Sequence, residues 1–249
     1  MFAIKSKSDI EKMAQGGKKL AAVKTKLMKN VKEGSSAWDI EVLANELIQK
    51  EGGKSSFKMV ANYSWATCIN VNEGLVHGIP KREVIFKKGD VVSVDVGMYY
   101  RGFHTDTSFS IGISPTEATS NFLEVGKLAL KKAIAKTQAG QRIFDISKVV
   151  QDALVTHDLT PIRALVGHGI GRDLHEEPQI PCFVAQSREK TTKIVSGMVL
   201  AIEVMYSQGT PDVVKSADGW TISMADGKIS ALFEETVAVT EAGPLVLTT

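Results

Sequence analysis

The stretch DVGMYYRGFHTDTSFS, residues 95–110, places two carboxylates close together within strand-like sequence. Asp95 lies at the end of the apolar run VVSVD, and Asp106 lies in the next run. The two runs predict strands over 91–98 and 103–111, joined by the four-residue tip YYRG. In a symmetric hairpin of this kind Asp95 lies directly opposite Asp106, with Cβ atoms about 4.5–5.5 Å apart.

Two like charges at that separation in a buried sheet require compensation. A shared proton and a bound cation are both open as explanations. Three more polar residues interrupt apolar strands further along: His168 in LVGHGIG, Glu203 in MVLAIEVMY and Glu234 in ALFEETVAV. Taken with the two aspartates, they supply carboxylate and imidazole ligands at five strand positions. This set indicates a site that holds two metal ions.

The sequence also repeats itself. EGSSAWDIEVLANELIQKEGG, from Glu33, is similar to AGQRIFDISKVVQDALVTHDL, from Ala139. Each copy predicts a pair of amphipathic helices around a glycine turn, followed by strands. The positions that match at one offset are Gly34 with Gly140, Trp38 with Phe144, Asp39 with Asp145, and Ile40 with Ile146. We therefore expect one α+β domain over residues 1–249, with internal pseudo-two-fold symmetry and a single site between the halves.

The composition is that of an ordinary globular protein. Of 249 residues, 43% are hydrophobic and 23% are charged, and the net charge of +2 favours neither DNA nor a membrane surface as a partner. The two cysteines, Cys68 and Cys182, lack a CxxC spacing, and the first residues contain no apolar run of signal-peptide length. We therefore expect a cytoplasmic protein. Nine lysines among the first 32 residues would suit RNA, although a solvated helix face explains them more simply.

Six motifs of the chain, in their order and spacing, resemble the type I methionine aminopeptidases. They are CINVNEGLVHGIP, VVSVDVGMYYRGFHTDTSFS, LVGHGIGRDLHEEPQ, MVLAIEVM, DGWT and ALFEET. The resemblance covers essentially the whole chain. It implies the pita-bread fold, in which two pseudo-symmetric helix-helix-strand halves surround a curved antiparallel sheet.

The resemblance also implies a site for two divalent ions, with cobalt, manganese, iron and zinc all suited to the ligands. Asp95 would bind one ion, His168 and Glu203 the other, and Asp106 and Glu234 would bridge them. A water or hydroxide between the ions would attack the first peptide bond, and Glu203 would act as general base and then acid.

Five further residues would contact the substrate. His77 and His175 match the family's two substrate-facing histidines, and Tyr63, Cys68 and Trp220 match positions of its methionine pocket. The implied function is removal of the initiator methionine from nascent polypeptides, carried out by a monomer that could associate with the ribosome. Because the family prefers a small second residue, we expect a chain that begins Met1-Phe2 to keep its own methionine.

Several neighbours of the ligands depart from the family pattern. Gly97 and Ala201 replace threonines, Val204 replaces a proline, Leu174 replaces an aromatic residue, and Glu235 replaces a histidine. Lost hydroxyls would loosen the ligands, and a carboxylate at Glu235 would alter the metal preference unless it points away. An acid at this last position is commoner in Xaa-Pro peptidases of the same fold, which are the first alternative. A non-catalytic binding module on this fold is the second.

Overall fold

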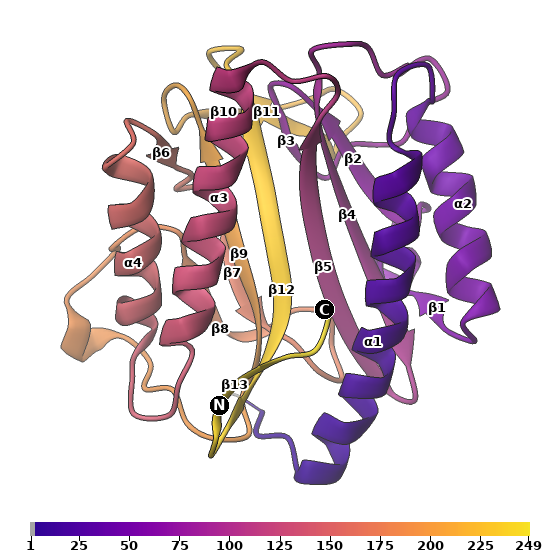
Figure 1. The fold of residues 1–249 in the computed structure, drawn as a ribbon. Coiled ribbons are helices and arrows are strands. Elements are labelled where there is room, and N and C mark those ends of the chain that lie inside the picture. Colours follow the sequence, from indigo (N-terminus) through magenta and orange to yellow (C-terminus); the bar gives the residue numbers. More distant parts are fainter. Residues whose placement is uncertain (1–2) are drawn as a thin grey trace.

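The structure is a computed structural model that describes residues 3–249. Met1 and Phe2, on which the expectation of methionine retention depends, lie outside the described residues. Four long helices lie on one face of a large sheet (Figure 1). The helices are α1 (Lys7–Asn30), α2 (Ala37–Lys50), α3 (Glu117–Lys136) and α4 (Ile143–Val155), and two short 3-10 turns are η1 (Phe57–Met59) and η2 (Arg188–Lys190).

The large sheet is antiparallel throughout, with the order β1-β4-β5-β12-β9-β7-β8. Strands β2, β6 and β13 pair with β4, β9 and β12, respectively, and a separate small sheet has the order β10-β11-β3. The strands of the first half are β1 (Lys54–Ser55), β2 (Thr67–Val71), β3 (Gly74–Val76), β4 (Val91–Tyr100) and β5 (Phe103–Gly112). Those of the second half are β6 (Thr160–Pro161), β7 (Val166–Gly169), β8 (Glu176–Pro181), β9 (Val199–Ser207), β10 (Val213–Lys215), β11 (Ile222–Met224), β12 (Ser230–Thr240) and β13 (Gly243–Val246). The predicted α+β pita-bread fold is confirmed.

The predicted repeat is visible in how the second helix of each half begins. The Asp39 carboxylate accepts from the backbone N–H of Ser36 at 2.8 Å, and the Asp145 carboxylate accepts from that of Arg142 at 2.8 Å. Both aspartates therefore cap a helix through the same N3 contact. A glycine with positive φ precedes each of the two helices. Helix α2 and helix α4 thus begin in equivalent ways, as the sequence repeat predicts.

Each half has its own apolar core between its helices and its strands. In the first half, Leu20 of α1 and Ile40 of α2 are buried with Val94 of β4. In the second half, Leu154 of α4 and Tyr206 of β9 are fully buried, and the Tyr206 hydroxyl donates to a backbone carbonyl of α3 at 2.8 Å. None of the helices within residues 3–249 combines the length and the apolarity that a membrane span requires. The helices fill one face of the sheet, so the opposite face is free to carry a site.

Candidate metal centre

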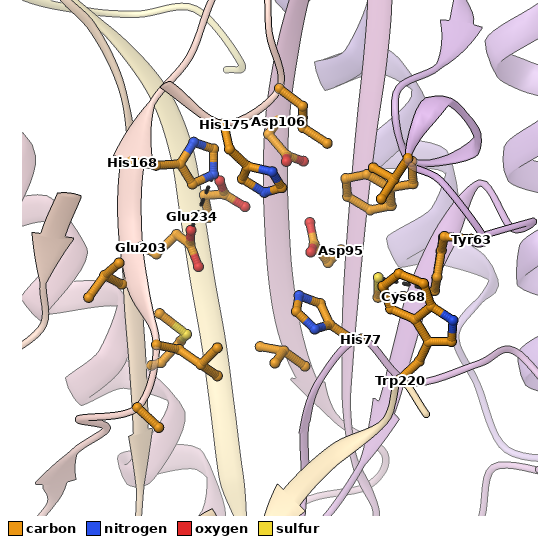
Figure 2. A pocket seen from close by; sticks show the side chains of 18 residues that line it. Tyr63, Cys68, His77, Asp95, Asp106, His168, His175, Glu203, Trp220 and Glu234 are labelled. Atoms are coloured by element: carbon orange, nitrogen blue, oxygen red, sulfur yellow. Dashed lines mark hydrogen bonds and ion pairs between the residues drawn. The ribbon is translucent and has the colours of Figure 1, made fainter. Parts of the chain in front are cut away.

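Strand register brings four carboxylates to the face of the sheet opposite the helices. Glu203 of β9 pairs with Glu234 of β12, Glu234 pairs in turn with Ser108 of β5, and Ser108 pairs with Asp95 of β4. Asp106 lies two residues from Ser108 along β5. Residues that pair, or that lie two apart on one strand, share a face. The four side chains therefore converge although they come from four strands (Figure 2).

The predicted hairpin register was wrong by two residues. Asp95 pairs with Ser108, and Asp106 pairs with Gly97, so the two aspartates are diagonal neighbours and not direct partners. The strands continue further than expected because the turn consists only of Arg101 and Gly102, with φ values of 50° and 91°. Positive φ at both positions is typical of the tight hairpin turns that match strand twist. A shift of two residues preserves the face, which is why both carboxylates still reach the same site.

His168 of β7 completes the cluster from the edge of β9. Its Nδ1 lies 2.8 Å from the backbone oxygen of Gly169. A carbonyl oxygen can only accept, so Nδ1 carries the proton and the lone pair of Nε2 is free. That Nε2 lies 3.5 Å from Oε1 of Glu203. Ligand atoms of Asp106, His168 and Glu234 lie within 4.8 Å of one another, and all three residues are buried.

Burial dominates the electrostatics of this cluster. It raises the pKa of Asp95 to about 7. The pKa values of Asp106, Glu203 and Glu234 are raised well above normal, first by burial and then by the neighbouring carboxylates. Burial also lowers the pKa of His168 to about 4, which keeps the imidazole neutral at neutral pH. Four carboxyl groups that resist ionisation beside a neutral imidazole form a site in which a cation would replace protons.

The residues present fit a metal ion. Oδ1 of Asp95 and Oε1 of Glu234 are buried without a hydrogen-bond partner, which is an unfavourable state for carboxylate oxygens. Divalent cations bound among the carboxylates would give such oxygens partners. Mixed carboxylate and imidazole donors suit manganese, iron, cobalt and zinc. A single shared proton, the other explanation open from sequence, would leave most of the four carboxylates without compensation.

The cluster opens into a cavity of about 290 Å³ that also contains the predicted substrate residues. His77 and His175 line it from opposite halves, and the rings of His168 and His175 lie 4.5 Å apart, edge to face. His77 has a φ of 55°, and its ring lies 6.5 Å from that of Trp220 (Figure 2). Burial lowers the pKa of both His77 and His175. The neutral rings can donate to a substrate through one nitrogen each.

The other wall of the cavity is apolar. The Tyr63 hydroxyl donates to the backbone oxygen of Thr67 at 2.9 Å and lies 3.2 Å from the Cys68 sulfur. Tyr63 and Trp220 pack edge to face with ring centroids 5.0 Å apart. Burial raises the pKa of the Cys68 thiol, so the sulfur stays protonated, and Cys68 lines the cavity.

Seven lining residues were not identified from sequence. They are Phe57, Val60, Val76, Ala164, Leu165, Val166 and Met205. Met205 was within reach of sequence reasoning because it lies two residues after Glu203 on one strand and so shares its face. Phe57 and Val60 lie in and after η1, and Ala164 lies in a loop before β7, where no periodic pattern marks a side chain as facing the cavity.

The structure shows where each departure near the ligands lies, and it gives a local reason for Gly97. A Cβ on Gly97 would lie 2.8 Å from Cβ of Ser56, so glycine fits the close approach of that residue. Ala201 pairs with His168, and Val204 is fully buried in the core of the second half. Leu174 lines the cavity. The remaining departure, Glu235, points away from the cluster.

On the helix side of the sheet, Glu235 accepts from Nζ of Lys24 at 2.6 Å, and its carboxylate lies 3.1 Å from the hydroxyl oxygen of Thr107. The alternative in which its carboxylate points away from the ligands is thus the one observed, as expected for strand neighbours. Glu235 therefore offers no ligand atom to the cluster. The one feature that favoured an Xaa-Pro peptidase does not reach the site.

Known proteins share both the sequence and the fold. Residues 11–241 match the model of metallopeptidase family M24. A methionine aminopeptidase of Aquifex aeolicus is 38% identical over 98% of this chain and 97% of its own length. Methionine aminopeptidase 1 of Bacillus subtilis is 36% identical over 100% of this chain and 99% of its own.

Solved structures agree with these relatives. The crystal structure of a methionine aminopeptidase from Thermotoga maritima superposes with a TM-score of 0.96 at 40% identity, with both chains fully covered. A prolidase from Pyrococcus furiosus, at 21% identity and a TM-score of 0.77, shares the fold over 99% of this chain and 65% of its own. The buried carboxylate and imidazole cluster, the full-length identity and the common fold agree, and the chain belongs to metallopeptidase family M24, among its methionine aminopeptidases.

Proposed function

We propose that the protein is a dinuclear metal-dependent aminopeptidase that removes the initiator methionine from nascent polypeptides. The observation that carries the proposal is one cavity with two different walls. One wall holds Asp95, Asp106, His168, Glu203 and Glu234, and the other holds a small apolar pocket. Such a cavity can bind the apolar side chain of a peptide's first residue beside a reactive centre. The full-length identity to named methionine aminopeptidases supports methionine as that residue.

In this proposal the five ligand residues would hold two divalent ions, and Asp106 and Glu234 would be shared by both. Bound divalent ions supply Lewis acidity and make a water molecule acidic enough to react near neutral pH. Burial raises the pKa of Glu203, which favours its carboxyl group as the group that takes up and returns a proton. His77 and His175 donate hydrogen bonds to the substrate peptide from opposite sides of the cavity.

The pocket for the methionine side chain is formed by Tyr63, Cys68, Trp220 and Leu174. A thiol and aromatic edges are polarisable surfaces that suit a thioether. The pocket is fixed by the contact between Tyr63 and Cys68 and by aromatic packing, so little reordering accompanies binding. We infer a preference for methionine over branched or charged first residues.

The test is release of the first residue from Met-Ala-Ser by apoprotein titrated with manganese or cobalt, with Leu-Ala-Ser and Ala-Pro-Ser in parallel. Methionine release that rises with metal, with little release from the other two peptides, is the expected result. Preferential cleavage of Ala-Pro-Ser would assign the protein to the Xaa-Pro peptidases. Failure to bind metal in calorimetry and to cleave any peptide would mean a binding module.

We propose further that the enzyme works as a cytoplasmic monomer on nascent chains and that exposed lysines of α1 allow ribosome association. Lys24 is bound to Glu235, and Lys19 donates to the backbone oxygen of Glu51 at 2.8 Å, whereas Lys18, Lys26 and Lys29 are exposed. Cosedimentation with ribosomes at low and high salt tests this. Binding that is absent at low salt would remove the ribosome from the proposal.

A further inference from the structure

The two halves meet along a seam between β5 and β12, where the backbone pairing is short. Among the described residues these strands pair only at Glu234 with Ser108 and at Glu235 with Thr107. By contrast, β4 and β5 pair along their whole lengths, and so do most of β9 and β12. Asp106 and Glu234, which approach each other within the ligand cluster, lie on opposite sides of this seam. Their separation therefore depends on what holds the seam together.

Side-chain hydroxyls take the place of backbone pairing on both sides of the short ladder. Thr236 Oγ1 accepts from the backbone N–H of Asp106 at 2.9 Å and donates to its carbonyl oxygen at 2.8 Å. At the other end, Ser110 Oγ accepts from the N–H of Leu232 at 3.0 Å and donates to its carbonyl oxygen at 2.8 Å. An inserted hydroxyl keeps the two backbones further apart than a direct hydrogen bond would, so the strands diverge on both sides of the ladder.

On the helix side of the seam, a charged cluster joins β5, β12, α1 and the C-terminal segment. Lys24 Nζ donates to Glu235 Oε1 at 2.6 Å and to Thr107 Oγ1 at 3.1 Å. The Thr107 hydroxyl donates to the backbone oxygen of Glu234 at 2.9 Å, and the Thr248 hydroxyl donates to Glu235 Oε2. The side chains of Lys24 and Glu235 are only 12% and 13% exposed. We refer to Lys24, Thr107, Glu235 and Thr248 as the seam clamp.

Two residues of the seam clamp directly follow two of the proposed ligands in the sequence. Thr107 follows Asp106, and Glu235 follows Glu234, so each clamp residue shares a peptide bond with a ligand residue and faces the other way. We propose that Lys24, acting through Glu235 and Thr107, is a positioning residue that sets the separation of Asp106 and Glu234 and thereby the affinity for divalent ions. The inference rests on the proposed metal-dependent function.

The charge of Lys24 and its role in positioning Glu235 and Thr107 predict opposite changes in metal affinity when Lys24 is removed. Loss of a positive charge near a cation site makes the local potential more negative, so charge alone predicts tighter metal binding in Lys24→Met. If Lys24 acts by holding Glu235 in place, its removal leaves the Glu235 carboxylate partly buried without a positively charged partner. The carboxylate can then move away from Thr107. The seam then loosens, and metal binding weakens. The sign of the change therefore separates the two effects.

The experiment is calorimetric titration of the apoprotein with manganese for the wild type, Lys24→Met, Lys24→Arg and Lys127→Met. Lys24, Lys127 and Glu235 line one groove on the helix side of the seam. Lys127 pairs at the surface with Glu124 at 2.7 Å, so it matches Lys24 in charge but not in its contacts. We expect Lys24→Met to bind manganese about 10-fold more weakly, as loss of a partner behind a ligand usually does. Lys24→Arg should restore most of the affinity, and Lys127→Met should bind as tightly as the wild type or slightly more tightly.

Thr107→Val provides a second variant without any change of charge, and its branched side chain suits a strand. It should also weaken manganese binding while thermal unfolding of the apoprotein stays cooperative. Manganese binding in Lys24→Met or Thr107→Val as tight as in the wild type would overturn the proposal. A wild type that binds no manganese would instead contradict the proposed function itself.

Discussion

The two halves of the molecule share a scaffold but contribute different chemistry at matching places. In the first half Asp95 of β4 pairs with Ser108 of β5, and in the second half Glu203 of β9 pairs with Glu234 of β12. The first half therefore offers a carboxylate and a hydroxyl where the second offers two carboxylates. The first half supplies its second carboxylate from Asp106, which lies two residues before Ser108. The duplicated fold fixes where side chains can converge, and each half supplies its own residues at those places.

The largest effect is expected when Asp106, the additional carboxylate of the first half, is replaced. Asp106→Asn keeps the size of the side chain but replaces a charged oxygen with an amide that binds cations poorly. We expect methionine release to fall by more than about 100-fold, because losing a ligand is more severe than losing a partner behind one. The measurement is peptide turnover at limiting manganese, with circular dichroism as the check on folding. Near-normal turnover in a folded variant would contradict the bridging role.

A smaller effect should appear in the pH dependence of apoprotein stability, to which both halves contribute carboxylates. Burial raises the pKa of Asp95 to about 7, above that of an unfolded aspartate, so the folded chain binds this proton more tightly. Stability must then fall as pH rises through the folded pKa. Between about pH 7.5 and about pH 9 the histidines are neutral in the unfolded chain as well as in the folded chain, where burial lowers their pKa values, so they contribute little. The slope over this interval comes from Asp106, Glu203 and Glu234, whose pKa values are raised well above normal.

We therefore expect the thermal midpoint of the apoprotein to fall by at least about 2 °C over that interval. Saturating manganese should reverse the slope, because ionised carboxylates bind the metal and protons compete with it. Differential scanning calorimetry at several pH values, with and without metal, measures both slopes. A midpoint of the apoprotein that rises with pH over the interval would contradict the assigned protonation of the cluster.

The smallest effect on turnover is expected at Ser108, where the first half has a hydroxyl and the second half has the Glu234 carboxylate. Ser108 pairs with Glu234, yet its hydroxyl is buried without a hydrogen-bond partner. Ser108→Ala should therefore change methionine release by less than about twofold, and it should not lower the unfolding free energy by more than about 0.5 kcal/mol. Peptide turnover and thermal unfolding are the measurements. A large loss of turnover would mean that the Ser108 hydroxyl takes part in the reaction. The first half would then resemble the second half in using a functional side chain at this place.

Much of the fold and all five proposed ligands could be predicted from sequence, because strand periodicity and the order of the motifs can be read directly from the amino-acid sequence. An alternating apolar strand identifies which residue interrupts it, as Glu203 and Glu234 do. The hairpin register could not be predicted in this way. It depends on Arg101 adopting a left-handed backbone conformation. Residues other than glycine seldom adopt this conformation, so the presence of an arginine does not predict it. Because the error was two residues and not one, the predicted site was unaffected.

The apolar pocket was predictable only in part. Tyr63, Cys68 and Trp220 were recognised from matched motifs, whereas Phe57 and Ala164 reach the cavity from irregular segments. A side chain in such a segment has no period that assigns it to a face, so only the three-dimensional path of the chain decides where it points. The direction of Glu235 was left open by sequence for another reason. Strand alternation favoured the helix side, but only the position of Lys24 shows what stabilises the carboxylate there.

His77 occupies a left-handed backbone conformation, with φ at 55°, that residues other than glycine adopt rarely. The next residue, Gly78, is locked against β2, where its carbonyl accepts from the N–H of Ile69 at 2.8 Å. A Cβ at Gly78 would lie 2.1 Å from the oxygen of Ile69, so no larger residue fits without displacing the strand. The backbone at His77 is therefore preorganised, and its conformational entropy is already lost when the chain folds. A peptide that binds here does not have to order the backbone that carries the imidazole ring.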